Sequence, residues 1–368
     1  MISVFGSLVG DEEIQNVKDC MDSQWLGFGK TVADFESAYE KKFNVPNFLM
    51  VDSGSNALYL ALVSMNLPKN SEVILPSFTW VSCAQAILLA GLKPVFCDVD
   101  YESMNITKEH IKKKLSSSTS AIMVVHYAGL PVDMDEILSL GYPVLEDAAH
   151  ATCSTYKGKA CGTIGDAGIF SFDAVKNFTV GEGGGFTTKN KNSFIRAKQL
   201  RYCGIGKSGF DSVVEGNDVW WEYNISEPFI KMLPTNLNAA IGLGQIKKID
   251  SLQKKREEIW NFYQTSFSDL DFIKTPINGS KDFKHSYFTY CIRVENRNEL
   301  AKFLLDNNIY TTLRYHPLHL NPLYNQTNIG LKNCEKLNKE ALSIPLHPRL
   351  TSLDIDFVVK KIKEFYEK

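Results

Sequence analysis

The chain has 368 residues, 44% of them hydrophobic and 22% charged, and its 40 basic and 42 acidic residues leave a formal net charge of −2. This length suits about two globular domains, and the nearly balanced charge gives no reason to expect binding to nucleic acid or to an anionic membrane. No run reaches the roughly 18 apolar residues of a membrane span, and the N-terminal stretch MISVFGSLVG lacks the basic and apolar segments of a signal peptide, so we expect a cytoplasmic protein.

The cysteines are scattered along the chain, with no C-x-x-C pair and no other spacing typical of metal ligands. We therefore expect reduced thiols and no zinc or other metal site. The eight residues are Cys20, Cys83, Cys97, Cys153, Cys161, Cys203, Cys291 and Cys334.

Over the first two-thirds of the chain, short apolar runs alternate with stretches of helical pattern. Two of these stretches, 55–65 and 79–91, predict helices, and Gly91 is a plausible cap for the second. Strands that alternate with helices indicate βαβ units, and hence a mostly parallel sheet with helices on both faces. Ligands of such α/β folds bind at the carboxyl ends of the strands. The runs that predict buried strands are 47–52, 71–76, 93–100, 121–127 and 142–147.

After residue 240 the pattern changes. A long helical stretch at 238–267 is followed by a turn-rich segment at 277–284. The remaining residues predict a smaller α+β domain that the long helix joins to the first, so we expect a large domain at 1–245 and a small C-terminal domain at 246–368. The elements expected in the small domain are a strand at 286–294, a helix near 299–308, a strand near 310–315 and a helix at 353–368.

The segment Ser53-Gly54-Ser55-Asn56 follows a predicted strand and opens a predicted helix. Free backbone N–H groups at a helix N-terminus, beside small hydroxyl side chains, suit a phosphate group. The same residue types also cap helices that bind no ligand.

Asp147 ends the apolar run YPVLED. A carboxylate at the tip of a buried strand is costly unless a cation or hydrogen-bond donors stabilise it. A protonated pyridine nitrogen would be such a cation, and backbone N–H groups are the alternative. Glu146 should point to the opposite face of the sheet and is the poorer candidate.

Lys176 lies five residues after Ser171 in the segment GIFSFDAVKNFTVGEGGG, just before a glycine-rich turn. A lysine is usually a solvated surface charge, but one held among apolar residues and close-packed backbone has a lowered pKa and attacks carbonyl groups more readily. The Ser171 hydroxyl could then contact a phosphate. Trp80, in PSFTW at a strand end, is either a core residue or an aromatic that stacks on a planar cofactor. Together these residues offer a phosphate cradle, a pyridine anchor, a stacking ring and a Schiff-base lysine.

Longer motifs in the same order resemble a known family. They are SGSNALYLAL, ILPSFTWVSCAQAILLAGLKPVFCDVD, VHYAGLPVDMDEI, VLEDAAHA, YKGKACGTIGDAGIFSFDAVKN, GEGGG, LNAAIGLGQIKKID, LRYHPLHLNPLY and ALSIPLHP. Nearly the whole chain, from about residue 8, is similar to the DegT/DnrJ/StrS-type aminotransferases of nucleotide-sugar biosynthesis, which depend on pyridoxal 5′-phosphate (PLP). The resemblance implies the aspartate-aminotransferase-like PLP fold type I, with PLP in the large domain, and a homodimer with two shared active sites.

The resemblance also assigns roles to individual residues. Lys176 matches the lysine that carries PLP as a Schiff base, and Asp147 matches the aspartate that binds the pyridinium nitrogen. His150 stands where the family has Gln or His near the phenolic oxygen of the cofactor. Lys231 stands where an Asn or Lys reaches the phosphate from the partner subunit, although Phe229 and Ile230 replace the glycine that the family has before it. The remaining matches are the phosphate-binding positions Gly54, Ser55, Asn56 and Ser171 and the ring-stacking Trp80.

The implied reaction moves an amino group from L-glutamate, the expected donor, to the keto group of a nucleotide-linked sugar. Related sugar dehydratases have a histidine in place of the lysine, so Lys176 favours transamination. A small phosphorylated ketone or a cyclitol is the alternative acceptor, because the cofactor motifs do not report acceptor size. UDP, dTDP and GDP all fit as the nucleotide.

Two other classes of function fit less well. A regulator that binds PLP without catalysis would need a sensor or DNA-binding segment, and a nicotinamide enzyme would need a G-x-G-x-x-G turn after the first strand; neither is present. Tyr315, His316 and His319 are candidate sugar or hinge contacts, with structural packing near Pro317 as the alternative. His126 ends a predicted strand near the expected site, where we assign it no role beyond orientation.

Overall fold

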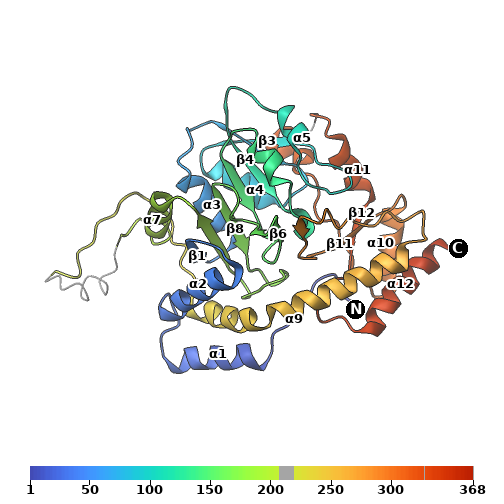
Figure 1. The fold of residues 1–368 in the computed structure, drawn as a ribbon, viewed down its shortest axis with the longest axis horizontal. Helices are drawn as coiled ribbons and strands as arrows, with labels where there is room; N and C mark the ends of the chain where they lie inside the picture. Colours follow the sequence, from blue (N-terminus) through green and yellow to red (C-terminus); the bar gives the residue numbers. More distant parts are fainter. Residues whose placement is uncertain (207–218, 327, 368) are drawn as a thin grey trace.

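The computed structural model describes residues 1–206, 219–326 and 328–367, and a seven-stranded sheet forms its centre (Figure 1). Neighbouring strands from β3 to β8 are parallel, whereas β9 runs antiparallel to both β8 and β1. The predicted α/β fold with a mostly parallel sheet is therefore confirmed. The strands lie in the order β1 (Phe48–Val51), β9 (Gly184–Thr188), β8 (Ala167–Ser171), β5 (Val144–Asp147), β4 (Thr119–Val125), β2 (Glu72–Pro76) and β3 (Lys93–Cys97).

Helices cover both faces of this sheet, as expected for strands that are apolar along their whole length. In β1, Leu49 and Val51 pack with α3 (Gly54–Ser64), α4 (Val81–Leu89) and α7 (Lys191–Leu200). Phe48 and Met50 point to the other face and pack with α2 (Lys30–Phe43) and α9 (Asn236–Phe267). Residues i and i+2 of the strand thus share a face. The other helices of this part are α1 (Asp11–Asp22), α5 (Lys108–Lys112), α6 (Met134–Leu138) and the 3₁₀ turn η1 (Tyr127–Gly129).

The glycine-rich sequence of β9 fits its crowded position. A Cβ atom on Gly184 would lie 2.4 Å from the Ser53 carbonyl oxygen, and one on Gly185 would lie 2.2 Å from the Phe48 ring. Only glycine lets this antiparallel strand lie against β1 and the start of α3. We did not expect β8 and β9 from the sequence.

The long predicted helix is α9, which runs from beside α1 and α2 to α12 (Figure 1). At its far end a second apolar cluster gathers around Trp260, Tyr263 and Tyr290. The predicted domain boundary after residue 245 falls inside α9 and stays a prediction. The elements beyond α9 are β10 (Phe283–Lys284), β11 (Tyr290–Arg293), α10 (Arg297–Asp306), η2 (Leu318–Leu320), η3 (Pro322–Tyr324), α11 (Lys332–Glu340), β12 (Ala341–Ile344) and α12 (Ser352–Tyr366).

The smaller sheets lie outside the central one. Strands β11 and β12 form an antiparallel pair, and β10 pairs with β6 (Thr155–Tyr156), which pairs with β7 (Lys159–Ala160). The strand predicted near 310–315 was wrong: Thr312 makes one isolated bridge to Ser343, and the chain then turns inward. Among the described residues, no helix is both long enough and apolar enough to cross a membrane.

Glu146 points to the face of the sheet opposite that of Asp147, as predicted, and is fully buried. Its carboxylate accepts backbone N–H groups from Gly162 at 2.7 Å and from Ile164 and Gly165 at 2.5 Å. It also contacts His126 Nε2 at 2.9 Å. Because His126 Nδ1 accepts the Val132 N–H, Nε2 carries the hydrogen and donates it to Glu146. His126 is therefore a structural residue that ties β4 to β5.

Glu146→Ala should destabilise the protein by about 3–5 kcal/mol, because three backbone N–H groups and His126 would lose their buried acceptor. The measurement is the thermal unfolding midpoint. Glu136→Ala is the matched control: that exposed carboxylate pairs with Lys108 at the surface, and its removal should cost less than about 1 kcal/mol. Equal midpoints for the two variants would contradict this role of Glu146.

Candidate active site

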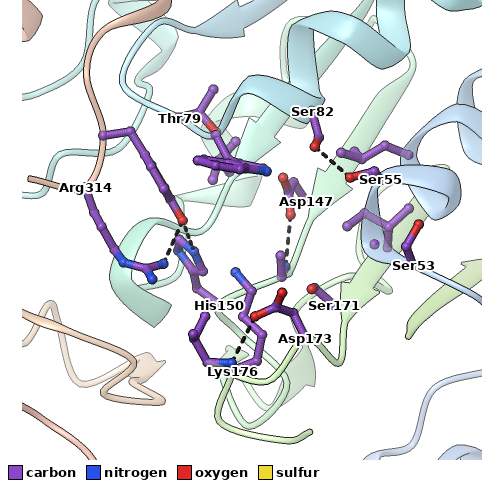
Figure 2. Close-up of a pocket in the computed structure, with 18 of the residues that line it drawn as sticks. Ser53, Ser55, Thr79, Ser82, Asp147, His150, Ser171, Asp173, Lys176 and Arg314 are labelled. Atoms are coloured by element: carbon purple, nitrogen blue, oxygen red, sulfur yellow. Dashed lines mark hydrogen bonds between the residues drawn. The ribbon is translucent and has the colours of Figure 1, made fainter. Parts of the chain in front are cut away.

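One pocket lies at the carboxyl edge of the central sheet, where α/β folds bind ligands. Figure 2 shows its labelled side chains around a single hollow, with Ser53, Ser55 and Ser82 on one side and Arg314 and His150 on the other. The lining residues are Ser53, Gly54, Ser55, Leu58, Thr79, Trp80, Ser82, Val125, Asp147, Ala149, His150, Ile169, Ser171, Asp173, Val175, Lys176, Glu182, Arg314 and Tyr315.

The N-terminus of α3 forms one side of this pocket. Ser53 caps the helix, and its side chain accepts the Asn56 N–H at 3.2 Å. A Cβ atom on Gly54 would lie 2.9 Å from Ser171 Cβ, so glycine is what lets the helix approach the end of β8. Ser55 Oγ lies 2.7 Å from Ser82 Oγ. The hydroxyl groups and the helix N-terminus together form a site suited to an anion.

The predicted phosphate-binding residues do not all line the pocket. Gly54, Ser55 and Ser171 line the pocket, whereas the Asn56 side chain turns away and donates to Asp52 Oδ1 at 2.7 Å. We did not expect Ser82, which lies in the first turn of α4.

Asp147 is 5% exposed and lies at the end of β5. Its Oδ1 accepts the Ala149 N–H at 2.9 Å, and its Oδ2 accepts the Cys83 thiol at 3.1 Å. Burial and the neighbouring Asp147 raise the pKa of the Cys83 thiol well above its usual value, which keeps the thiol protonated as a donor. Because no lysine, arginine or histidine among the described residues forms an ion pair with this carboxylate, it is well placed to face a cationic ligand atom.

Lys176 lies on the other side of Asp147 from the Ser55–Ser82 pair (Figure 2), and its Nζ stands 4.9 Å from the centre of the Phe288 ring. Burial, assisted by the positive charge of Arg314, lowers the pKa of this amine to about 8, against the opposing effects of Asp147 and Asp173. The neutral amine is the nucleophilic form, so this environment prepares Lys176 to attack a carbonyl group.

His150, Tyr315 and Arg314 form a hydrogen-bonded row. Arg314 Nη1 donates to Tyr315 Oη at 3.0 Å, and Tyr315 Oη lies 3.0 Å from His150 Nε2. Since a guanidinium group only donates, the tyrosine hydroxyl accepts from Arg314 and donates its own hydrogen to Nε2. The hydrogen of the neutral imidazole is therefore on Nδ1, which is buried and has no partner. Burial, Lys176 and Arg314 lower the pKa of His150 well below its usual value, in agreement with a neutral ring.

Trp80 precedes α4 and is 54% exposed, with its ring 5.4 Å from that of Tyr315. It thus stands at the mouth of the pocket, where a planar ligand could stack on it.

The remaining candidates lie outside the pocket. His319 is buried, with Nδ1 2.7 Å from Ser77 Oγ, and exposed His316 contacts Asn338 at 3.0 Å, so of the three residues singled out in the RYHPLH segment only Tyr315 lines the pocket. Lys231 is exposed and does not line it. Sequence reasoning missed Arg314, Thr79, Asp173 and Glu182. Within the described part of the chain no group of His, Cys, Asp and Glu could hold a metal ion.

A profile of the DegT/DnrJ/EryC1/StrS aminotransferase family matches residues 8–363. A dTDP-4-dehydro-2,3,6-trideoxy-D-glucose 4-aminotransferase from Saccharopolyspora spinosa is 31% identical to the chain and aligns with 100% of it and 97% of its own length.

Two solved structures share the whole fold. The aminotransferase TlmJ from Streptoalloteichus hindustanus superposes with a TM-score of 0.94 at 32% identity, covering 100% of this chain and 99% of its own. The PLP form of the putative sugar aminotransferase Spr1654 from Streptococcus pneumoniae superposes with a TM-score of 0.90 at 25% identity, covering 99% and 98%. The expected aminotransferase fold is thereby confirmed.

The reactivity of Lys176 should depend on pH with a midpoint near 8, because only the neutral amine reacts. Acetic anhydride labelling at a series of pH values, followed by peptide mass spectrometry, measures that midpoint. Removing the positive charge by Arg314→Gln should move it to higher pH, and removing the negative charge by Asp147→Asn should move it to lower pH. A midpoint near the 10.4 or so of an ordinary lysine, or shifts of the same sign in both variants, would refute this account of the amine.

Proposed function

Because the chain belongs to the DegT/DnrJ/EryC1/StrS aminotransferase family and is a PLP-dependent sugar aminotransferase, we propose that it transfers an amino group from L-glutamate to a keto group of a nucleotide-linked deoxysugar. The observation that carries this proposal is the joint position of Lys176, Asp147 and the anion site of α3 in one pocket. A small phosphorylated ketone or a cyclitol is the alternative acceptor.

The residues of this pocket fit PLP. The hydroxyls of Ser55, Ser82 and Ser171, with the N-terminus of α3, would hold its phosphate. Asp147 would hold its ring nitrogen, and the unpartnered Nδ1–H of His150 offers a donor to an oxygen atom of the ligand. The remaining two contacts are Trp80, which would stack on the ring, and Lys176, which would carry the cofactor covalently.

Each group in the pocket would have a separate role in the reaction. Bound PLP supplies an electron sink for the bond that breaks at the amino-bearing carbon. The Asp147 carboxylate would keep the ring nitrogen protonated. Once displaced by the donor, the Lys176 amine would remove the α-proton of the amino acid and later return a proton to the sugar carbon that receives the amine.

The nucleotide-linked acceptor is supported by the similarity to the S. spinosa enzyme, whose name specifies a dTDP-linked keto sugar. The half-exposed Trp80 side chain, which lines the pocket, is also accessible to a ligand that extends outward. The donor L-glutamate is supported by the positive charge of Arg314 in the wall of the pocket, which suits a carboxylate.

We also propose a homodimer in which each pocket receives Lys231 from the partner subunit. Lys231 is exposed in this chain and lies outside its own pocket. Exposed apolar side chains lie close to it in the sequence, at Trp220, Trp221, Tyr223 and Ile230. Grouped apolar side chains of this kind typically pack against another protein surface.

The first test is the visible absorbance of the purified protein with PLP, before and after L-glutamate, beside a Lys176→Ala control. The native protein should show a visible band that glutamate bleaches, and the variant should not. A native protein without the band would refute the assignment of Lys176, and a band that glutamate leaves unchanged would refute glutamate as the donor.

Mixing Lys176→Ala and Lys231→Ala subunits tests the shared site. Each variant alone should be inactive, but a mixed dimer has one pocket with both lysines intact. Random exchange of subunits should therefore restore about a quarter of the native activity, since half of the dimers are mixed and each has one complete site. Full activity in Lys231→Ala alone, or no restoration after verified exchange, would contradict the assignment.

A further inference from the structure

Cys83 lies behind the Asp147 carboxylate, outside the pocket. It is the third residue of α4, its side chain is fully buried, and it does not line the pocket. Its thiol donates to Asp147 Oδ2 at 3.1 Å, and its Sγ lies 3.2 Å from the Thr79 hydroxyl oxygen. Any effect of this thiol on a ligand must therefore pass through its two polar neighbours, which both line the pocket (Figure 2).

The hydrogen bonds of the thiol have a defined direction. A thiol carries one hydrogen, and an ionised carboxylate only accepts, so the hydrogen of Cys83 points to Asp147. The Thr79 hydroxyl must then donate its own hydrogen to the sulfur. The three side chains form a chain of donors that ends on the carboxylate, and in such a chain each bond strengthens the next.

The buried Asp147 carboxylate depends on donors of this kind. Among the described residues, no lysine, arginine or histidine forms an ion pair with it. Its Oδ1 accepts the Ala149 N–H at 2.9 Å, and its Oδ2 accepts the Cys83 thiol. A carboxylate that is removed from water keeps its charge only where hydrogen bonds or cations stabilise the ionised form. Without the thiol, Oδ2 would have no donor from the described part of the chain.

The donors decide where the hydrogen shared between a ring nitrogen and Asp147 resides. The hydrogen lies on the nitrogen if the carboxylate is the weaker base, and on the carboxylate if the nitrogen is the weaker base. Donors to the carboxylate oxygens stabilise its ionised form, and so they favour the hydrogen on the ring. The protonated ring is the form that withdraws electrons from the reacting carbon.

We propose that Cys83 is a positioning residue that holds Asp147 ionised and thereby keeps the shared hydrogen on the ring nitrogen of PLP. This inference rests on the proposed function. The alternative is that Cys83 only fills space in the apolar cluster to which it belongs. Serine and alanine are similar in volume but differ in a hydroxyl group, so the variants Cys83→Ser and Cys83→Ala separate the two roles.

The experiment records the ¹⁵N chemical shift of ring-labelled PLP in the loaded protein by solid-state NMR at neutral pH, because this shift distinguishes a protonated from a neutral ring nitrogen. In Cys83→Ala the signal should move toward that of a neutral pyridine. In Cys83→Ser, which keeps a donor, it should stay at the native position or move further toward that of a pyridinium ion. The rate at which glutamate bleaches the visible band should fall by about 2-fold to 10-fold in Cys83→Ala, as for the loss of one hydrogen bond, and return in Cys83→Ser.

Two further variants complete the series. Thr79→Val removes the hydroxyl that donates to the thiol, so its signal should move in the same direction as that of Cys83→Ala, by a smaller amount. Cys97→Ala is the control, because Cys97 is also fully buried, at the end of β3, and does not line the pocket. Its signal should match that of the native protein. If Cys83→Ala does not fold, as judged by its thermal unfolding, a native signal in Thr79→Val would overturn the proposal.

The outcomes separate this inference from the proposed function. Equal signals in Cys83→Ser and Cys83→Ala would assign the residue to packing and overturn the proposal, as would a move toward pyridinium in Cys83→Ala. If the native ring is protonated but the variants do not differ, the aminotransferase stands and only the role of Cys83 is lost. A native protein with a neutral ring nitrogen would refute the proposed role of Asp147, and this inference with it.

Discussion

The end of β5 carries two consecutive carboxylates on opposite faces of the sheet, and the pocket depends on how each is satisfied. Glu146 accepts three backbone N–H groups and the His126 imidazole, which fixes the loop between Gly162 and Gly165 against the strand. From the described residues, Asp147 accepts only the Ala149 N–H and the Cys83 thiol. One carboxylate is thus fully occupied inside the protein, and its neighbour keeps capacity for a ligand. Consecutive side chains of a β-strand point to opposite faces of the sheet, and this alone gives the two carboxylates different surroundings.

The positively charged side chains of the pocket, Lys176 and Arg314, also differ in how the protein stabilises them. Burial and the positive charge of Arg314 lower the pKa of the Lys176 amine, whereas guanidinium groups in general remain charged. The mechanism that we propose uses this difference: one residue supplies a nucleophilic amine and the other a permanent cation. Asp147 and Asp173 limit the effect, which leaves the amine near the middle of its titration at slightly alkaline pH.

The sequence predicted the parts of the site that depend on regular structure. Asp147, Trp80 and Ser55 follow or precede elements whose apolar periodicity is clear, so their place at one edge of the sheet could be inferred. The first strand of each βαβ unit could also be predicted, because it is a continuous apolar run. Strand β9 was not, because GGFTT has a weak strand pattern and its glycines serve a close contact with Ser53 and Phe48 that only the folded chain contains.

Arg314 was missed for a related reason. The segment 310–315 reads as a strand, and nothing local tells that its arginine turns inward to meet Phe5, which lies at the other end of the chain. For Asn56 the position in the first turn of α3 could be predicted, but not the Asp52 carboxylate that accepts from its side chain, and its contact with a phosphate stays a prediction. The predicted reach of Lys231 involves a second subunit, and one chain contains no contact that could reveal it.

The N-terminal segment completes the pocket wall from a great distance along the chain. Ile2 exchanges backbone hydrogen bonds with Asn308 and Tyr310, the Ser3 carbonyl accepts from His347 across 344 positions, and Phe5 covers Arg314. Residues 2–5 are made well before residues 308–347, and contacts between them require long loop closures. The contact between Phe5 and Arg314 therefore joins parts of the pocket wall that lie about 300 residues apart in the chain, as long-range closures do.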